Sequence, residues 1–248
     1  MHAVSIIIPV YNEQERIVQT INQVIASDTL GLKKEIIVVD DGSTDNTVKN
    51  IKSQISNFKS TRLEAKRANQ NSKLALITHK KNQGKGAALK AGFKKATGDI
   101  LMVQDGDLEY STDDYPQLLN PFIKDKAQIV YGSRNKARRK YGTPYSSFSF
   151  FFGGIILTWI INMLFGIKLT DQATGYKLFS KKLKQFLLKP DENRFSYEVA
   201  LTATLAKEKI QFIEVPIHYQ PRSIQDGKKI NIMDFIESVI VAIKYRFK

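Results

Sequence analysis

The chain contains no cysteine and only three histidines. Without thiols it has no disulfide bond, no thiolate metal site and no cysteine nucleophile, and its redox compartment stays open. His2 is close to the N-terminus, and His79 and His218 each lie at the end of a run that resembles a strand. We therefore interpret all three histidines as structural and expect no histidine general base.

The N-terminus lacks the basic segment that opens a secretory signal peptide. Instead, the apolar run VSIIIPV begins at Val4, and acidic residues follow at Glu13 and Glu15. This pattern predicts a first β-strand and not a targeting segment.

Acidic residues are scarce relative to basic ones. The 248-residue chain has 38 lysines and arginines against 24 aspartates and glutamates, which gives a formal charge of +14. Such a protein attracts nucleic acids, anionic lipid headgroups or phosphorylated substrates, and the charge alone does not choose among them. The hydrophobic content of 42% suffices for the core of one large α/β domain.

The first 132 residues repeat a short β-branched run, a polar turn and a helical stretch. The runs are Val4–Val10, Glu35–Asp40, Leu74–Thr78, Ile100–Gln104 and Ala127–Gly132. Their nearly continuous apolarity is typical of strands covered on both faces. We therefore predict an α/β fold with a doubly wound, mostly parallel sheet and helices on both faces. The polar segment Lys59–Lys73 is interpreted as a solvated loop.

Polar residues follow these runs, and ligands bind beyond the carboxyl ends of parallel strands. The run ILMVQDGDLEY ends in Asp105 and Asp107. Carboxylates at the end of a rigid element, shared with substrate phosphates, suit Mg²⁺ or Mn²⁺. Taken alone, however, the Asp-x-Asp pattern fits a polar turn better than a metal site.

Two other polar segments favour a nucleotide. Asp40 and Asp41 open DDGSTDNT, which fits a helix start, yet two adjacent carboxylates need hydrogen-bond donors such as those of a base or ribose. In NQGKGAALKAG, two glycines flank Lys85 ahead of a helical stretch. This is neither a Walker loop nor a dinucleotide fingerprint. Close backbone approach at a helix N-terminus beside a cation favours a phosphate.

In this order and at this spacing, the motifs PVYNE, VVDDGSTD, N-x-GKG and QDGDLE resemble the nucleotide-sugar half of inverting family 2 glycosyltransferases with the GT-A fold. The later segments TDQATGYKLF, RFSYEVAL and VPIHYQPRSIQDGKKI are similar to the branch of dolichyl- or polyprenyl-phosphate hexosyltransferases. The resemblance covers essentially the whole chain. It implies one GT-A-like catalytic domain at 1–230, with a nucleotide-sugar half at 1–132 and an acceptor half at 133–230, and a C-terminal helix at 231–248.

The resemblance also implies site residues. The donor, a GDP- or UDP-hexose such as mannose or glucose, would be held by Pro9, Tyr11, Glu13, Asp40, Asp41, Lys85, Gln104 and Asp105. A Mg²⁺ or Mn²⁺ ion would be held by Asp105, Asp107 and Glu109, the last of which is often Gln in relatives. This ion would stabilise the negative charge on the leaving nucleoside diphosphate.

The acceptor implied by the resemblance is a polyprenyl phosphate. It suits a site without an evident base, because a phosphate monoester is already an anion and needs only positioning. An acceptor hydroxyl on a glycan or glycolipid would need a base, for which Asp171 and Glu198 are candidates. Asp171 also fits a turn or cap, and Glu198 also fits a helix surface.

Two groups of cations suit an anionic acceptor. Arg134 follows a predicted strand in the segment GSRNKARRKYG and is expected to face the cleft, although this run also fits a solvated or nucleic-acid-binding patch. The second group lies in PRSIQDGKK, where the spacing departs from the Arg-x-x-Gly-x-Ser-Lys of mannosyl-transferring relatives and leaves the sugar open. The resulting catalytic set is Asp107, Arg134, Asp171, Arg222 and Lys229.

No charged residue occurs from Tyr141 to Ile167, and the core of this stretch, residues 147–167, is nearly long enough to span a bilayer. We favour a helix that lies in or dips into one leaflet, with a buried core helix and a span as alternatives. A span would place residues 170–229 across the membrane from the predicted nucleotide site.

Residues 231–248 predict an amphipathic helix, which either contacts a membrane or packs on the domain. Its apolar positions are Ile232, Ile236, Val239, Ile240 and Ile243, and basic residues follow. With the positive net charge, this favours a peripheral or monotopic protein at the cytoplasmic face of the cell membrane.

The sequence thus predicts a metal-dependent, inverting hexosyltransferase with a nucleotide-sugar, a polyprenyl phosphate and a membrane surface as partners. Nucleic acid is not an expected partner, and the oligomeric state is open. The alternatives from other classes are a basic nucleic-acid-binding α/β protein and a lipid-binding scaffold without catalysis.

Overall fold

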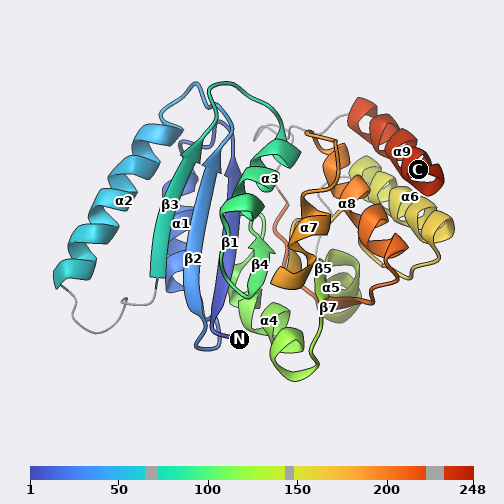
Figure 1. Ribbon diagram of the computed structural model, residues 1–248, viewed down its shortest axis with the longest axis horizontal. Coiled ribbons are helices and arrows are strands. Elements are labelled where there is room, and N and C mark those ends of the chain that lie inside the picture. The colour runs from blue at the N-terminus through green and yellow to red at the C-terminus, as the bar shows by residue number, and fades with distance from the viewer. Residues whose placement is uncertain (65–71, 143–147, 222–231) are drawn as a thin grey trace.

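The computed structural model describes residues 1–64, 72–142, 148–221 and 232–248. Its centre is a seven-stranded sheet in the order β3-β2-β1-β4-β6-β5-β7 (Figure 1). The strands are β1 Ala3–Val10, β2 Lys33–Asp40, β3 Ser72–Thr78, β4 Ile100–Val103, β5 Ile129–Ser133, β6 Lys177–Ser180 and β7 Phe212–Pro216. The helices are α1 Ile17–Ala26, α2 Thr47–Glu64, α3 Lys85–Lys95, α4 Tyr115–Lys124, α5 Arg134–Tyr141, α6 Phe148–Phe165, α7 Lys184–Leu187, α8 Ser196–Lys207 and α9 Ile232–Phe247, with short 3₁₀ helices η1 Thr112–Asp114 and η2 Lys181–Leu183.

The predicted mostly parallel sheet is confirmed. Strands β1, β2, β3 and β4 pair in parallel, and so do β5 and β7. Strand β6 is the exception, because it lies antiparallel between β4 and β5 and joins the two parallel groups into one sheet. The carboxyl ends of β1, β2 and β4 therefore meet at one edge, and the chain that leads into β6 arrives at the same edge.

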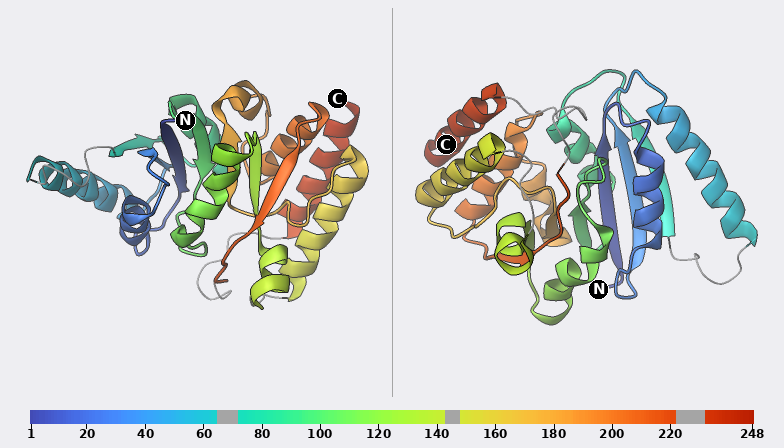
Figure 2. Two further views of the ribbon diagram at one scale, coloured as in Figure 1. Left: turned by 90° about the horizontal axis from the view of Figure 1, so that it is seen from below. Right: turned by 180° about the vertical axis from the view of Figure 1, so that it is seen from behind.

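Both faces of the sheet are covered. Side chains on β1 alternate between two apolar clusters, since Ile6 and Ile8 pack with α1 and α4 while Ile7 packs with α3 and α8. Figure 2 shows α1 and α3 on opposite sides of the strands. This double coverage explains why the strands read as apolar runs without clear alternation.

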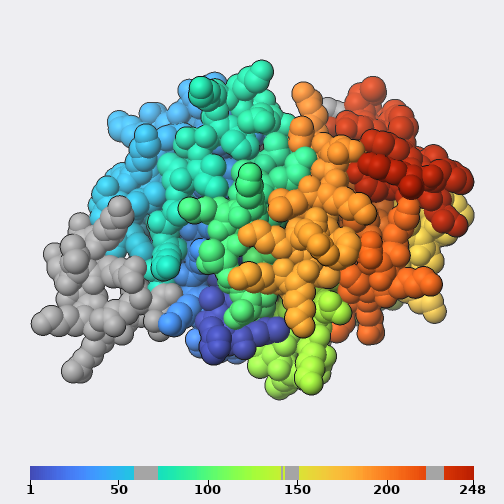
Figure 3. Space-filling model, in the orientation of Figure 1, coloured from blue at the N-terminus to red at the C-terminus, as the bar shows by residue number. Residues whose placement is uncertain are grey.

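A third apolar cluster joins α6, α8 and α9. Leu157 and Ile161 of α6 pack against Val199 of α8 and against Val241 and Tyr245 of α9. In the space-filling view, α8 and α9 form one end of the molecule and α2 and β3 the other (Figure 3). The two segments predicted to face lipid, α6 and α9, thus lie side by side although they are far apart in the sequence.

The expected loop at 59–73 is wrong at both ends. Helix α2 continues to Glu64, and β3 begins at Ser72. Polar residues such as Lys, Arg and Glu are good helix formers, so a polar segment after a helix start can extend the helix. Residues 65–71 lie outside the described part of the chain.

Candidate active site

A cavity of about 1010 Å³ opens at the carboxyl edge of the sheet. The predicted site residues that line it are Pro9, Tyr11, Glu13, Asp41, Lys85, Asp105, Asp107, Glu109, Arg134, Asp171 and Glu198. Asp40 and Gln104 do not line it. Arg222 and Lys229 lie outside the described residues. The fold thus brings together side chains from both halves of the chain.

Asp41 is fixed at the wall of the cavity by a set of donors. Its carboxylate accepts hydrogen bonds from the backbone N–H groups of Gln83, at 3.1 Å, and Gly84, at 2.6 Å. The Nδ1 atom of His79 lies 2.7 Å from Asp41 Oδ1. His79 therefore orients a residue of the site, which goes beyond the structural role that the sequence indicates.

Asp40 has a different role from its neighbour. It is buried, and its Oδ2 accepts hydrogen bonds from the N–H groups of Gly42 and Ser43. Gly42 has a φ of +75°, and a Cβ there would lie 2.5 Å from the carbonyl carbon of Lys81. Asp40 thus shapes the turn through Oδ2, while its Oδ1 has no hydrogen-bond partner among the described residues. Its contact with the donor stays a prediction.

The glycines around Lys85 do not form a phosphate cradle. A Cβ on Gly84 would lie 2.4 Å from the carbonyl oxygen of Asn193, and one on Gly86 would lie 2.4 Å from Cβ of Tyr197. Two backbone N–H groups at the start of α3 are also already hydrogen-bonded within the protein. The N–H of Gly84 donates to Asp41, and the N–H of Ala87 donates to the carbonyl of Asn193. Close packing of α3 on the start of α8 therefore explains this motif.

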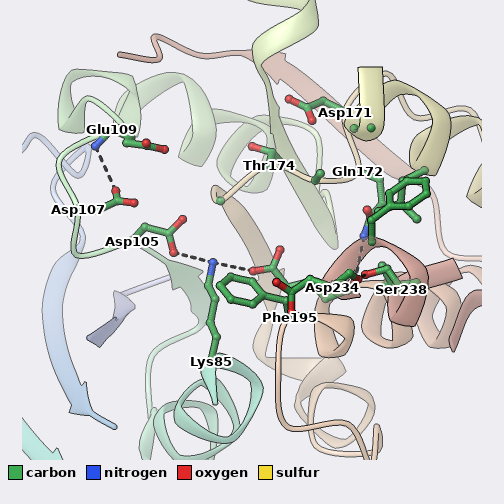
Figure 4. Close-up of a pocket in the computed structure, with 18 of the residues that line it drawn as sticks. Lys85, Asp105, Asp107, Glu109, Asp171, Gln172, Thr174, Phe195, Asp234 and Ser238 are labelled. Carbon is green, nitrogen blue, oxygen red and sulfur yellow. Dashed lines mark hydrogen bonds and ion pairs between the residues drawn. The ribbon is translucent and has the colours of Figure 1, made fainter. Parts of the chain in front are cut away.

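The side chain of Lys85 forms ion pairs with two carboxylates of the cavity, one from each half of the chain. Its Nζ lies 2.8 Å from Asp105 Oδ1 and 2.7 Å from Glu198 Oε1 (Figure 4). The other carboxylate oxygen of Glu198 lies 2.5 Å from Nζ of the buried Lys177. Charges thus alternate along a chain from Lys177 in the core to Asp105 at the cavity.

This alternation sets the protonation states. Burial opposes ionisation of Glu198, but the Lys177 and Lys85 ammonium groups outweigh it and lower the pKa of Glu198 to about 2. Burial would lower the pKa of Lys85, but Asp105 and Glu198 hold that pKa well above its ordinary value. Glu198 is therefore an ion-paired carboxylate and a very weak base, which argues against the base role considered for it and against an exposed helix surface position.

Burial raises the pKa of Asp105, and the nearby Asp107 and Glu198 carboxylates add to this rise, while Lys85 opposes it. A cation at this place would relieve the repulsion between carboxylates. Asp105 and Asp107 supply the hard oxygen ligands that Mg²⁺ and Mn²⁺ prefer, with room in the same cavity for a diphosphate. The two aspartates thus fit a divalent ion.

Glu109 does not complete a carboxylate triad. Among the described residues, no group of three His, Cys, Asp or Glu side chains is arranged to hold a metal ion. Oε2 of Glu109 instead accepts a hydrogen bond of 3.0 Å from the hydroxyl of Tyr219. The expected third metal ligand is therefore corrected to a partner of Tyr219, an interaction between residues 110 positions apart that sequence does not show.

Gln104 belongs to the support behind the site. Its Oε1 accepts hydrogen bonds from the hydroxyls of Tyr115, at 2.7 Å, and Tyr176, at 2.9 Å, and its Nε2 donates to the carbonyl of Asp105. Gln104 is buried, so the predicted contact with the donor is corrected. The two tyrosines lie 11 and 72 positions from Gln104, and their convergence on one amide depends on tertiary structure.

Arg134 and Asp171 form a two-pronged ion pair. Nε and Nη2 of Arg134 each lie 2.7 Å from a carboxylate oxygen of Asp171, and the N–H of Arg134 donates to the same carboxylate. The guanidinium also lies over the Tyr219 ring, 5.2 Å from its centroid. Asp171 is buried and uses both oxygens on Arg134, so it positions a cation and is poorly placed to take a proton.

The other wall of the cavity is largely apolar. It is formed by α6, the start of α8 and α9, through Phe151, Phe152, Ile155, Ile156, Phe195, Val199, Ile232 and Phe235. Asp234 and Ser238 of α9 are polar members of the same lining. Carboxylates, the arginines Arg134, Arg138 and Arg194 and this apolar wall therefore share one continuous cavity. Such a cavity accommodates a ligand with a charged head and an apolar tail.

Several residues of the site escaped the sequence interpretation. The segment TDQATGYK was singled out for Asp171, yet its Gln172, Thr174 and Gly175 also line the cavity. A Cβ on Gly175 would lie 2.2 Å from Asp105 Oδ2, so this glycine lets the segment pack on the proposed metal ligand. A glycine inside a polar motif was the available signal, but it does not reveal what the backbone approaches.

Comparisons with known proteins agree with this geometry. The model of Glycosyl transferase family 2 matches residues 5–186. The UDP-N-acetylglucosamine–dolichyl-phosphate N-acetylglucosaminyltransferase of Methanococcus voltae is 31% identical over 235 residues, which cover 92% of this chain and 90% of that protein. The dolichyl-phosphate beta-glucosyltransferase ALG5C of Trichomonas vaginalis is 29% identical over 258 residues, which cover 97% of this chain and 71% of that protein.

A solved structure shares the fold. Glucosyl-3-phosphoglycerate synthase from Mycobacterium tuberculosis, in complex with Mn²⁺, UDP and phosphoglyceric acid, superposes with a TM-score of 0.68 at 16% identity. The match covers 99% of this chain and 78% of that one. The GT-A-like fold expected from the sequence is thereby confirmed. The chain belongs to glycosyl transferase family 2, and it is a glycosyltransferase.

Proposed function

We propose that this glycosyltransferase transfers a hexose or N-acetylhexosamine from a UDP-sugar to a polyprenyl phosphate such as dolichyl phosphate, with Mg²⁺ or Mn²⁺ and with inversion at the anomeric carbon. The observation that carries the proposal is the continuity of one cavity, which is lined by Asp105 and Asp107, by Arg134 and by an apolar wall. The activities for which the two relatives are named support a dolichyl phosphate acceptor, and UDP in the structural neighbour supports the donor.

The donor side follows from the carboxyl edge of β1, β2 and β4. Pro9, Tyr11 and Asp41 would hold the nucleoside, and Lys85 would lie beside the diphosphate. Asp105 and Asp107 would hold the divalent ion, which supplies stabilisation of the charge on the departing diphosphate. Lys85 is already anchored by Glu198 and needs little reorganisation to contribute positive charge there.

The acceptor side provides a cation and an apolar channel. Arg134, held by Asp171, would bind the acceptor phosphate, and the chain of the lipid would lie along α6 and α9. A phosphate oxygen attacks the anomeric carbon and forms the new C–O bond. The bond from that carbon to the β-phosphate oxygen breaks, and the nucleoside diphosphate leaves with the electron pair. Attack on the opposite face inverts the configuration.

The step requires no proton transfer from the acceptor, because the phosphate monoester is already ionised. This agrees with the two candidate bases, since Asp171 is bound to Arg134 and Glu198 has a pKa of about 2. An acceptor hydroxyl would leave its proton without a suitable base among these groups.

A lipid acceptor also calls for contact with a membrane. The α6–α9 surface consists of exposed apolar side chains, namely Phe152, Ile155, Ile156, Trp159 and Met163 of α6 and Ile232, Met233, Ile236, Ile240, Ile243 and Phe247 of α9. Part of this surface also lines the cavity, so the cavity opens where a lipid would arrive. We propose that it rests on the cytoplasmic leaflet, whose anionic headgroups attract the positively charged chain.

Within the described ranges, the structure contains no helix with the length and apolarity to cross a bilayer. We also propose that residues 1–230 form one catalytic domain, in which residues 1–132 bind the nucleotide-sugar and residues 133–230 bind the acceptor.

A transfer assay tests the proposed function. The protein is incubated in detergent with polyprenyl phosphate, Mg²⁺ or Mn²⁺ and radiolabelled UDP-glucose, UDP-N-acetylglucosamine, GDP-mannose or GDP-glucose. We expect organic-soluble labelled product from a UDP-sugar and no product with EDTA. A matched alcohol, polyprenol, replaces the phosphate in a control. Product from polyprenol but not from its phosphate would contradict the proposed acceptor, and a preference for a GDP-sugar would contradict the proposed donor.

A further inference from the structure

The carboxylate of Asp105 has a cation of the protein beside it. Nζ of Lys85 lies 2.8 Å from Oδ1 of Asp105, and both side chains line the cavity, where 18% of Lys85 and 15% of Asp105 are exposed. Figure 4 shows the Lys85 side chain pointing at Asp105. In the part of the chain that the structure describes, no other basic side chain forms an ion pair with Asp105. Lys85 therefore supplies the positive charge at one of the two proposed metal ligands.

This ion pair competes with a divalent ion. The proposed metal site consists of Asp105 and Asp107, and the Lys85 ammonium group lies against the first of these carboxylates. Lys85 would repel a second cation at that carboxylate at close range and would have to give way to it. Without Lys85, the repulsion between the two carboxylates would favour a cation between them. We therefore expect Lys85 to weaken binding of a divalent ion to the free protein.

Lys85 has a second anion beside it, so it can leave Asp105 without becoming unpaired. Its Nζ also lies 2.7 Å from Oε1 of Glu198, whose other oxygen is held by Lys177 at 2.5 Å. The backbone of Lys85 is held in place, because the glycines on either side of it pack closely on residues 193–197. The movable part is the side chain, a flexible four-carbon stem. A diphosphate in the same cavity would offer its ammonium group new oxygens.

We propose that Lys85 neutralises Asp105 in the free enzyme and releases it to the divalent ion only when a nucleoside diphosphate binds the Lys85 ammonium group. The inference rests on the proposed function. It adds an order to that function, in which the metal site is completed together with the nucleotide and not before it. After transfer, departure of the diphosphate would return Lys85 to Asp105 and weaken the hold of the protein on the ion.

The test compares wild type with Lys85→Met, which removes the charge at similar side-chain length. Electron paramagnetic resonance measures free Mn²⁺ in titrations with and without saturating UDP. Without UDP, we expect Lys85→Met to bind Mn²⁺ about tenfold more tightly than wild type, because the competing cation is gone. A damaged fold would lower this affinity, so a gain is not explained by partial unfolding.

Addition of UDP should remove the difference between the two proteins. Wild type should bind Mn²⁺ at least about thirtyfold more tightly with UDP than without it. With UDP, Lys85→Met and wild type should agree within about threefold, because Lys85 then no longer pairs with Asp105. The factor by which UDP strengthens Mn²⁺ binding should therefore be about tenfold smaller in the variant.

Three further variants assign the gain to this ion pair. Lys85→Arg keeps the charge and should bind Mn²⁺ without UDP within about threefold of wild type. Lys90→Met removes a lysine of the same helix whose Nζ donates to the carbonyl of Pro190 at 3.1 Å, outside the cavity lining, and should leave Mn²⁺ affinity unchanged. Asp107→Asn, added to Lys85→Met, should abolish the gained affinity, since the ion loses one of its two carboxylates.

The outcomes separate this inference from the proposed function. If wild type binds Mn²⁺ in the presence of UDP but Lys85→Met shows no gain without UDP, the inference is wrong and the proposed function stands. Equal Mn²⁺ affinity of wild type with and without UDP would also overturn the inference, and this measurement needs no variant. Failure of wild type to bind Mn²⁺ even with UDP would overturn both the inference and the proposed metal dependence.

Discussion

The proposed donor and acceptor sides of the cavity are built in opposite ways. The donor side consists of short polar segments at strand ends, where Asp41 takes three donors and Lys85 bridges two carboxylates. The acceptor side consists of α6 and α9, which leave large apolar side chains exposed and contribute one face of the cavity. A preorganised polar wall suits a step in which charge moves, and an apolar wall suits a chain of repeated isoprene units.

The largest expected effect on the transfer rate comes from a substitution on the donor side, at Asp107. Asp107→Asn should lower transfer at least about a thousandfold, because one of two carboxylates for the divalent ion is lost. The labelled-product assay measures this, and EDTA should have the same effect on the wild type. Asp125→Asn, at the exposed C-cap of α4, is the control and should retain activity. Transfer by Asp107→Asn at the wild-type rate would refute the metal site.

Arg134 tests the acceptor side at its charged end. Arg134→Lys keeps the charge but loses the fork to Asp171, and it should lower kcat/KM for polyprenyl phosphate about thirtyfold to a hundredfold. Affinity for the UDP-sugar, measured by calorimetry, should stay within about twofold. Arg139→Lys, on the exposed part of α5, is the matched control. If the affinity for the UDP-sugar falls as much as kcat/KM for polyprenyl phosphate, Arg134 binds the donor. The assignment of Arg134 to the acceptor side would then be wrong.

Gly175 lies where the two sides touch. Gly175→Ala places a Cβ 2.2 Å from Asp105 Oδ2 and must displace that carboxylate. We expect Mn²⁺ affinity in the presence of UDP, measured by calorimetry, to fall about tenfold, since a displaced ligand coordinates poorly. Gly154→Ala, with no atom within 4 Å of its Cβ, is the control and should bind Mn²⁺ normally. Unchanged affinity of Gly175→Ala would show that Asp105 does not hold the ion.

The smallest effect is expected at the apolar end. The double substitution of Ile240 and Ile243 by Ser should weaken flotation with anionic vesicles about fivefold, because two apolar side chains no longer enter the lipid. Transfer to a short, detergent-solubilised acceptor should stay unchanged. Ile123→Ser, exposed on α4, controls for the loss of a surface isoleucine. Unchanged vesicle binding would contradict the proposal that the α6–α9 surface contacts the membrane.

The sequence predicts the donor side better than the acceptor side, for a physical reason. Strands such as Ile100–Val103 and the aspartates that follow them are local features, and parallel topology then brings strand ends together. The partners of Gln104 and Glu109 lie far along the chain, so their roles in the structure differ from the predicted ones. Strand β6, Lys177–Ser180, has only two apolar residues between a lysine and a serine, so its sequence did not indicate a buried strand.

The C-terminal helix shows the same limit. A helix at this place follows from the spacing of its isoleucines, and α9 spans Ile232–Phe247. The spacing does not reveal which apolar stripe meets the protein. In the structure Val241, Ala242 and Tyr245 are buried, whereas the predicted stripe with Ile236 and Ile240 is largely exposed. A helix that is apolar on two sides has no unique orientation until its neighbours are known.

The reversal of β6 has a consequence for how acceptors change within such a scaffold. Because β6 runs against β4 and β5, the chain between β5 and β6 begins and ends at the cavity edge. That insertion contains Arg134, α6 and Gly175. An exchange of this one contiguous segment would replace the proposed acceptor-phosphate residue and part of the proposed lipid-facing surface together, while β1 to β4 retain the proposed nucleotide site. Chimeras joined at β5 and β6 are thus the natural units for retargeting the enzyme.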